Sequence, residues 1–178
     1  MTLWLFAAAA FLLSIERICY VWAWRYPESF RRFCGNPGLF PPDSPVAVLQ
    51  RLFYCFKVIQ ILVFFGWCLV YGHGSLATPE GMAFPFALGG ILILTGQFLN
   101  FSVFYRLGEV GVFYGTRFGH EVPWCSEFPF SLLKHPQYVG TLLSIWGFFL
   151  AMRFPHSDWA VLPSLETVYY VLGAYWEQ

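Results

Sequence analysis

The residues best suited to chemistry gather in one stretch, 106–140, of a chain that otherwise avoids charge. The stretch reads RLGEVGVFYGTRFGHEVPWCSEFPFSLLKHPQYVG. Its ionisable side chains stand close in sequence to aromatic rings: Arg117, His120, Glu121, Lys134 and His135 beside Tyr114, Phe118 and Tyr138. In an apolar, membrane-embedded chain such a concentration of ionisable groups is typical of a ligand site. We therefore take this stretch as the candidate site.

Four glycines in the same stretch recur at intervals of three or four residues: Gly108, Gly111, Gly115 and Gly119. This spacing allows two helices to pack closely. It also allows a backbone to approach a bound ligand, because glycine has no Cβ. The ionisable neighbours favour the ligand interpretation.

Composition indicates that the elements around this site lie in a membrane. Of 178 residues, 58% are hydrophobic and only 11% are charged, against about 25% charged in soluble domains. The surplus apolar surface must face lipid, where helices satisfy their own backbone groups. The formal net charge is zero, so no basic field is available to attract nucleic acid. We expect one domain, 1–178, with an all-α fold: a polytopic membrane protein with four to five membrane helices.

Five apolar segments approach the length of about 20 residues that a bilayer requires: 2–24, 50–71, 81–105, 138–152 and 159–176. The first is expected to be a retained helix, because Glu16 and Arg17 follow its apolar run where a signal peptide would have a cleavage site. The fourth is short enough to be re-entrant. If all five cross, the basic connections 25–46 and 106–136 and the C-terminus lie on the cytosolic side.

Glu16, Arg17 and Lys57 are charged residues inside these segments. Glu16 and Arg17 are adjacent, so we expect them to point in different directions from their helix. Arg17 and Lys57 are expected to extend toward the interface, whereas Glu16 is harder to explain. We expect no metal site, because His120 and Glu121 are neighbours without a second histidine three or four residues away. The five cysteines show no CxxC spacing and predict no disulfide scaffold.

The order of the motifs adds a resemblance. GVFYGTRFG, then FPF, then KHPQYVG resembles the phospholipid methyltransferase family, which includes phosphatidylethanolamine N-methyltransferases. The resemblance covers about 81–178. The form of Lys134 to Gly140 is also similar to isoprenylcysteine carboxyl methyltransferases, which share the membrane architecture.

The resemblance implies methyl transfer from S-adenosylmethionine to the amine head group of a phospholipid, in the endoplasmic reticulum membrane if the source is a eukaryote. It implies that the methyl donor is bound by Gly96, Arg117, Gly119, His135, Pro136, Tyr138, Gly140 and Glu177. The catalytic candidates are His120, Glu121, His135 and Tyr138. A base is needed for the amine proton, and Glu109, Glu121 and His120 remain open for that role. Tyr114, Trp124 and Tyr138 suit a methylated ammonium through cation–π attraction.

Two positions depart from the family pattern. A glycine pair in the preceding helix is here Leu94-Thr95-Gly96, with only the second glycine present. A glutamate pair near the end of the last helix is here Glu177-Gln178, which leaves the second acidic ligand open. Relatives continue beyond this point, so we expect either a truncated chain or a donor site that is closed differently.

Other functions remain open at this stage. The histidine in HPQYVG favours methylation of a prenylated carboxylate, whereas the FPF element favours a phospholipid. The two departures are what a non-catalytic membrane protein of the same fold would show. A sterol-reductase-like enzyme shares part of the late-helix pattern but needs a longer chain. The sequence does not specify the number of methyl groups added or the oligomeric state.

Overall fold

Helices account for all the regular structure in the part of the chain that the computed structural model describes, residues 3–36, 44–76, 78, 81–123 and 125–177. These residues form no strand, which confirms the all-α prediction. The elements are α1 (Leu3–Arg25), α2 (Pro27–Cys34), α3 (Pro45–Tyr71), α4 (Ala83–Val112), the 3-10 helix η1 (Gly115–Phe118), α5 (Pro136–Arg153) and α6 (Val161–Trp176). Five of them match the apolar segments of the sequence, whereas α2 was not predicted.

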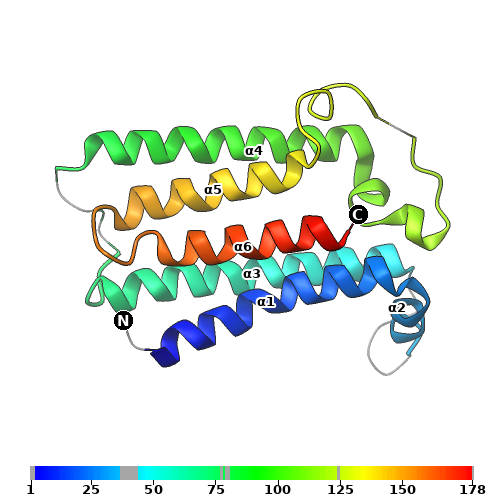
Figure 1. Cartoon of the computed structure of the whole chain (residues 1–178), viewed down its shortest axis with the longest axis horizontal. Coiled ribbons are helices and arrows are strands. Elements are labelled where there is room, and N and C mark those ends of the chain that lie inside the picture. The colour runs from blue at the N-terminus through cyan, green and yellow to red at the C-terminus, as the bar shows by residue number, and fades with distance from the viewer. Residues whose placement is uncertain (1–2, 37–43, 77, 79–80, 124, 178) are drawn as a thin grey trace.

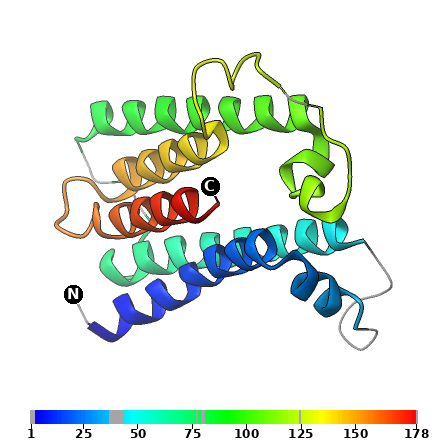
Figure 2. The ribbon, with the colours of Figure 1, turned by 45° about the vertical axis from the view of Figure 1, so that its right-hand side comes forward.

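The five long helices lie side by side as a bundle (Figures 1 and 2). α4 packs on α5, α5 on α6, and α1 on both α6 and α3. α1, α3 and the helix that begins at Ala83 are long and apolar enough to cross a membrane. α5 and α6 have 18 and 16 residues, so they are about 27 and 24 Å long at about 1.5 Å per residue. Figure 1 shows α5 running beside α4 to the far end of the bundle, which favours a crossing over a re-entrant segment.

Local chemistry sets where several helices begin and bend. Ser44 caps α3, because its Oγ accepts a hydrogen bond from the Ala47 N–H at 3.2 Å, and Pro45 follows at the first helical position. Pro136 begins α5 in the same way. Gly108 kinks α4 with a φ of 61°, a left-handed conformation that glycine adopts without strain.

α4 and α5 approach closely through pairs of glycines. A Cβ on Gly96 would collide with the Gly140 carbonyl oxygen, and one on Gly140 would meet the Gly96 carbonyl oxygen. Gly89 and Gly147 form a second pair with the same relationship. Small residues of this kind let helix backbones pack tightly in a membrane.

Two apolar cores lie along the bundle, with polar residues between them. On α1, Leu13 belongs to one core and Tyr20 to the other. On α3 the corresponding residues are Phe64 and Phe56. Three charged residues of these helices fall between these positions in sequence: Glu16, Arg17 and Lys57.

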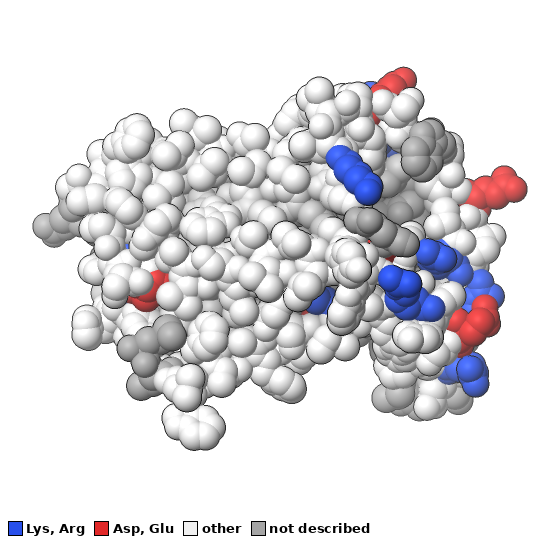
Figure 3. Space-filling model, in the orientation of Figure 1, with Lys and Arg blue, Asp and Glu red and all other residues white. Residues whose placement is uncertain are grey.

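Charged side chains gather at the end of the bundle that holds α2 and η1 (Figure 3). The C-terminal end of α6 reaches the same end, where Arg25 Nε donates a hydrogen bond to the Trp176 carbonyl oxygen at 2.6 Å. This arrangement places the connection after α1, the connection before α5 and the end of α6 on one side. It is the grouping expected if all five segments cross.

Candidate functional site

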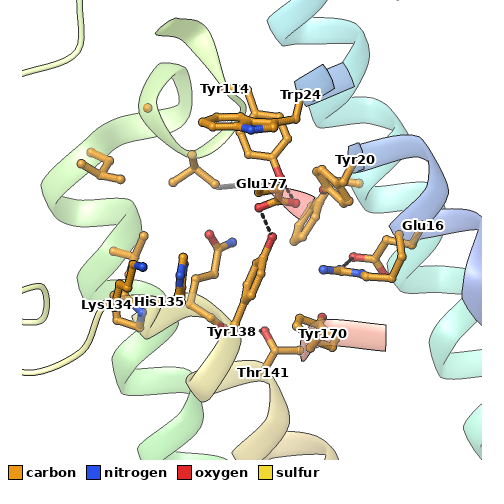
Figure 4. A pocket seen from close by; sticks show the side chains of 18 of the residues that line it. Glu16, Tyr20, Trp24, Tyr114, Lys134, His135, Tyr138, Thr141, Tyr170 and Glu177 are labelled. Atoms are coloured by element: carbon orange, nitrogen blue, oxygen red, sulfur yellow. Dashed lines mark hydrogen bonds and ion pairs between the residues drawn. The ribbon is translucent and has the colours of Figure 1, made fainter. Parts of the chain in front are cut away.

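A cavity of about 300 Å³ opens among the helices near the charged end of the bundle. Most of its polar and aromatic lining comes from five parts of the chain (Figure 4). These are Glu16, Arg17, Tyr20 and Trp24 from α1, Lys57 from α3, Tyr114 after α4, His135 to Tyr138 at the start of α5, and Tyr170 and Glu177 on and after α6. The volume lies at the lower end of the range of about 300–1,000 Å³ that is usual for small-molecule sites.

Glu177, at the end of α6, connects two other parts of the cavity lining through hydrogen bonds. Its Oε1 accepts a hydrogen bond from the Tyr114 hydroxyl at 2.8 Å, and its Oε2 accepts a short one from the Tyr138 hydroxyl (Figure 4). Tyr114 adopts a left-handed conformation with a φ of 58°, an uncommon state for a tyrosine that persists only when its surroundings fix it. The two phenols orient the carboxylate and leave its negative charge inside the cavity.

Aromatic rings surround this carboxylate. The Tyr114 ring meets those of Tyr20 and Trp24 edge to face, at 5.6 and 5.1 Å between centroids. The Arg117 guanidinium lies 3.8 Å from the centre of the Trp24 ring, so Arg117 reaches the cavity through a residue that lines it. A carboxylate beside several aromatic rings is suited to bind a sulfonium or an ammonium, because carboxylates and ring faces both attract cations.

His135 lies at the N-terminal end of α5, next to Tyr138. The two rings stack at 5.7 Å between centroids, and His135 Nε2 is buried without a hydrogen-bond partner among the described residues. Burial lowers the pKa of this imidazole, and the neighbouring Lys134 lowers it further, against an opposing effect of Glu177. A neutral ring with one unpaired nitrogen can bind a polar group of a ligand.

Glu16, Arg17 and Lys57 line the same cavity, so two expectations about these residues were wrong. Arg17 Nη2 contacts Glu16 Oε1 at 2.6 Å although the two residues are adjacent. Lys57 Nζ lies 3.2 Å from Glu16 Oε1 instead of extending to the interface. Arg17 also stays inside, with its guanidinium 3.9 Å from the centre of the Tyr170 ring. A buried charge requires a partner, and these side chains partner one another.

A chain of hydrogen bonds continues from this group toward the middle of the bundle. Lys57 Nζ donates to Gln60 Oε1 at 3.0 Å, and Gln60 Nε2 donates to Glu166 Oε1 at 2.7 Å. Glu166 is buried, at 2% exposure. The only sequence signals for these hydrogen bonds were a glutamate and a lysine inside apolar segments. Sequence alone does not show which helix faces meet.

The structure brings four of the predicted site residues to the cavity: His135, Pro136, Tyr138 and Glu177. Arg117 contacts it through Trp24. Gly96 and Gly140 lie instead in the contact between α4 and α5, and Gly119, with a φ of 85°, ends η1 on the exposed side.

The residues considered as bases lie elsewhere. Glu109, His120 and Glu121 are exposed and are absent from the described lining of the cavity. Trp124 and Gln178 lie outside the described residues. Among the described carboxylates, only Glu16 and Glu177 line the cavity.

Comparison with known proteins identifies relatives of this sequence. Residues 84–178 match the family described as phospholipid methyltransferase. The chain is 37% identical over 127 residues to a phosphatidyl-N-methylethanolamine N-methyltransferase from Arabidopsis thaliana, covering 71% of this chain and 67% of that protein. No solved structure matches the chain. The matched residues include α4, α5, α6 and Glu177, which together contribute much of the cavity.

Proposed function

Because the chain belongs to the phospholipid methyltransferase family, and is therefore a membrane phospholipid N-methyltransferase, we propose that it methylates phosphatidylethanolamine or its mono- and dimethyl forms. The relative from Arabidopsis is named for the monomethyl lipid. The observation that carries the proposal is the carboxylate of Glu177, held by two tyrosines among aromatic rings inside a membrane bundle. In such a transfer the donor sulfur carries a positive charge, and the acceptor amine gains one when it is methylated.

We propose that S-adenosylmethionine is the methyl donor and that it is bound in this cavity. It supplies an electrophilic methyl group on a sulfonium cation. The residues present fit such a molecule: Glu177 offers a negative charge, Tyr20 and Tyr114 offer ring faces, and His135 Nε2 offers an unpaired polar atom.

In this proposal the chain's residues act mainly by orientation. Tyr114 and Tyr138 hold the Glu177 carboxylate, which attracts the positively charged end of the donor. The rings exclude water around the reacting atoms, and correct placement in a dry site lowers the barrier to a displacement reaction. The amine must be neutral to attack. Glu16 contacts Arg17 and Lys57, so Glu177 is the described lining carboxylate that we assign as the general base.

His120, Glu121 and Glu109 do not contact the reacting atoms in this proposal, because all three are exposed and absent from the described lining of the cavity. In the same proposal Gly96 and Gly140 act in helix packing. The family resemblance further supports a location in the endoplasmic reticulum membrane of a eukaryotic host, which fluorescence microscopy of the tagged chain would test.

Radiolabelled methyl transfer tests the proposal directly. The purified chain is supplied with labelled S-adenosylmethionine and vesicles of phosphatidylethanolamine, its monomethyl form or its dimethyl form, with a farnesylcysteine peptide as the comparison. Label in one or more of the lipids is expected, and the pattern shows which steps are catalysed. Label confined to the peptide would contradict the proposal and favour carboxyl methylation.

A further inference from the structure

A second cavity, of about 640 Å³, lies between α3, α4 and α5. Its lining is rich in aromatic and aliphatic side chains, among them Phe64, Ile61, Ile93 and Phe148. The donor chemistry assigned to the first cavity makes no use of it. We refer to it as the groove.

The groove adjoins the first cavity. Phe53, Lys57, Gln137 and Thr141 line both spaces. A single molecule that reaches past these side chains would have its polar end beside Glu177 and its apolar end in the groove.

The groove follows one face of each helix over similar lengths. Its lining spans Phe53 to Phe65 on α3, Ile93 to Phe104 on α4 and Gln137 to Phe148 on α5. These spans hold twelve or thirteen residues each, so their ends are eleven or twelve rises of about 1.5 Å apart, which is about 16–18 Å. One leaflet of a bilayer has a hydrocarbon depth of about 15 Å, half of a core of about 30 Å. The groove therefore matches the depth that one acyl chain occupies.

The open side of the groove faces the lipid. Ile61 is 54% exposed, and Tyr54 and Phe101, on the two helices that flank the opening, are more exposed still. These residues lie on α3 and α4, which are both long and apolar enough to cross a membrane. Hydrocarbon chains are the surroundings of such a surface, so an acyl chain can enter the groove sideways without passing through water.

The junction of the two spaces carries positive charge. Lys57 lies there, and it shares the single carboxylate of Glu16 with Arg17, so two cations contact one anion. In a phospholipid the phosphate stands between the amine and the glycerol that bears the chains. A chain in the groove and an amine beside Glu177 bring that phosphate near Lys57, and ammonium groups bind phosphate strongly.

We propose that the groove between α3, α4 and α5 seats one acyl chain of the phospholipid acceptor, with Lys57 at the phosphate. The inference rests on the proposed function and names the part of the substrate that the groove recognises. It follows that the chain length of the lipid, as well as its head group, determines the rate.

A pair of tryptophan variants on α3 tests the proposal. Ile61→Trp fills the groove, whereas Leu62→Trp places the same side chain on a neighbouring residue that is 66% exposed and is absent from the groove lining. Each is assayed with dioleoyl and with dihexanoyl N-methylphosphatidylethanolamine. Ile61→Trp is expected to lower methylation of the dioleoyl lipid at least fivefold relative to Leu62→Trp, with little change for the short-chain lipid.

The outcomes separate the two proposals. Wild-type protein that labels neither lipid would refute the proposed function. Wild-type protein that labels the lipids, with an Ile61→Trp variant that matches Leu62→Trp on both, would refute the groove alone. An equal loss on both lipids with normal donor binding would also refute it, because chain seating would not be the affected step.

Crosslinking of the wild-type chain provides a measurement that does not depend on a folded variant. A dioleoyl lipid that carries a diazirine at the middle of one chain is photolysed in vesicles with the protein, and the adducts are mapped by mass spectrometry. Adducts concentrated on Ile61, Phe64 and Phe148 are expected. Adducts spread equally over Leu62 and the outer face of α1 would overturn the proposal.

Discussion

The hydroxyl of Tyr114 donates a hydrogen bond to Oε1 of Glu177 at 2.8 Å, although 63 residues separate them in the chain. This contact joins the end of α6 to the turn that follows α4. Both residues lie within the part of the chain that matches the phospholipid methyltransferase family. The motif-rich stretch and the last helix thus form one site, which the sequence shows only as two separate patterns.

Replacing Glu177 should weaken donor binding more than removing either phenol. Glu177 is proposed to contact the cationic donor directly, and a hydrogen bond that involves a charge contributes about 1.5–3 kcal/mol. Tyr114 and Tyr138 act on the donor only by orienting that carboxylate. We therefore expect Glu177→Gln to raise the Kd for S-adenosylmethionine about 10- to 100-fold, and Tyr114→Phe or Tyr138→Phe about fivefold. Isothermal titration calorimetry in detergent measures these constants.

Tyr175→Phe is the control for this series, because Tyr175 is exposed on α6 and does not line the cavity. Its Kd should equal that of the wild type. Equal affinities for Glu177→Gln and Tyr175→Phe would show that Glu177 does not contact the donor.

Donor binding should weaken at acidic pH through His135. Burial and Lys134 lower the pKa of its imidazole, so the ring is neutral at pH 7. Protonation places a charge beside Lys134 and a cationic donor, so the Kd should rise as pH falls below the usual histidine value of about 6.5. Calorimetry between pH 5 and 8 measures the change, and the profile should flatten in His135→Gln. An unchanged profile in that variant would assign the titration to another group.

The exposed residues His120 and Glu121 should have little effect on turnover. His120→Ala and Glu121→Gln are expected to keep methyl transfer within about twofold of wild type, since surface substitutions usually change free energies by about 0.5 kcal/mol or less. Initial rates at saturating donor and lipid measure this. A loss of tenfold or more in either variant would restore that residue as a base.

Substitutions at Gly96 and Gly140 should lower the stability of the protein and leave donor binding unchanged. A Cβ at either position meets the backbone of the facing helix, and overpacking of this kind typically costs about 1–3 kcal/mol. We expect Gly96→Ala and Gly140→Ala to lower the midpoint of thermal unfolding in detergent, with an unchanged donor Kd well below that midpoint. Weaker donor binding without a change in the midpoint would place the donor against these glycines.

The connection between α5 and α6 depends on a buried ion pair. Asp158 accepts hydrogen bonds from Arg153 at 2.7 and 2.9 Å and from Trp67 Nε1 at 3.0 Å. Removing one partner of a buried pair typically costs about 3–5 kcal/mol. Asp158→Asn should therefore lower the unfolding midpoint strongly, whereas Glu127→Gln, in an exposed pair with Arg106, should change it little.

The same pair gives a pH dependence of stability. Burial raises the pKa of Asp158, but its hydrogen bonds and charge contacts with Arg153 outweigh this, so the pKa is lowered overall. The stabilisation is then complete above the unfolded value of about 3.9 and is lost as pH falls through the lowered pKa. Thermal unfolding at pH 3 and pH 6 should differ more in wild type than in Asp158→Asn, and equal differences would contradict this role.

Hydropathy and motif order predicted much of the architecture. The apolar runs gave the five long helices to within a few residues at most ends, and His135, Pro136 and Tyr138 lie together because one helix start carries all three. Glu177 could be linked to them only through the family resemblance. Local patterns contain no information on the contacts between distant helices.

The polar interior was harder to predict for the same reason. Lys57 and Glu16 belong to different helices, 41 residues apart. Lys57 alone is compatible with extension to the interface, whereas Glu16 alone gives no indication of its partner. Their pairing depends on the rotation of α1 and α3 about their axes. Gly96 is ambiguous in a different way, because glycine in a membrane helix is equally suited to a ligand and to a second helix.

Methyl transfer to a phospholipid amine is expected to take place beside Glu177. This is tested by comparing the label transferred to N-methylphosphatidylethanolamine by the wild type and by Glu177→Gln, at equal amounts of folded protein and subsaturating donor. Labelled lipid from the wild type and at least a tenfold loss in the variant are expected. Equal transfer by both proteins would contradict this placement of the reaction.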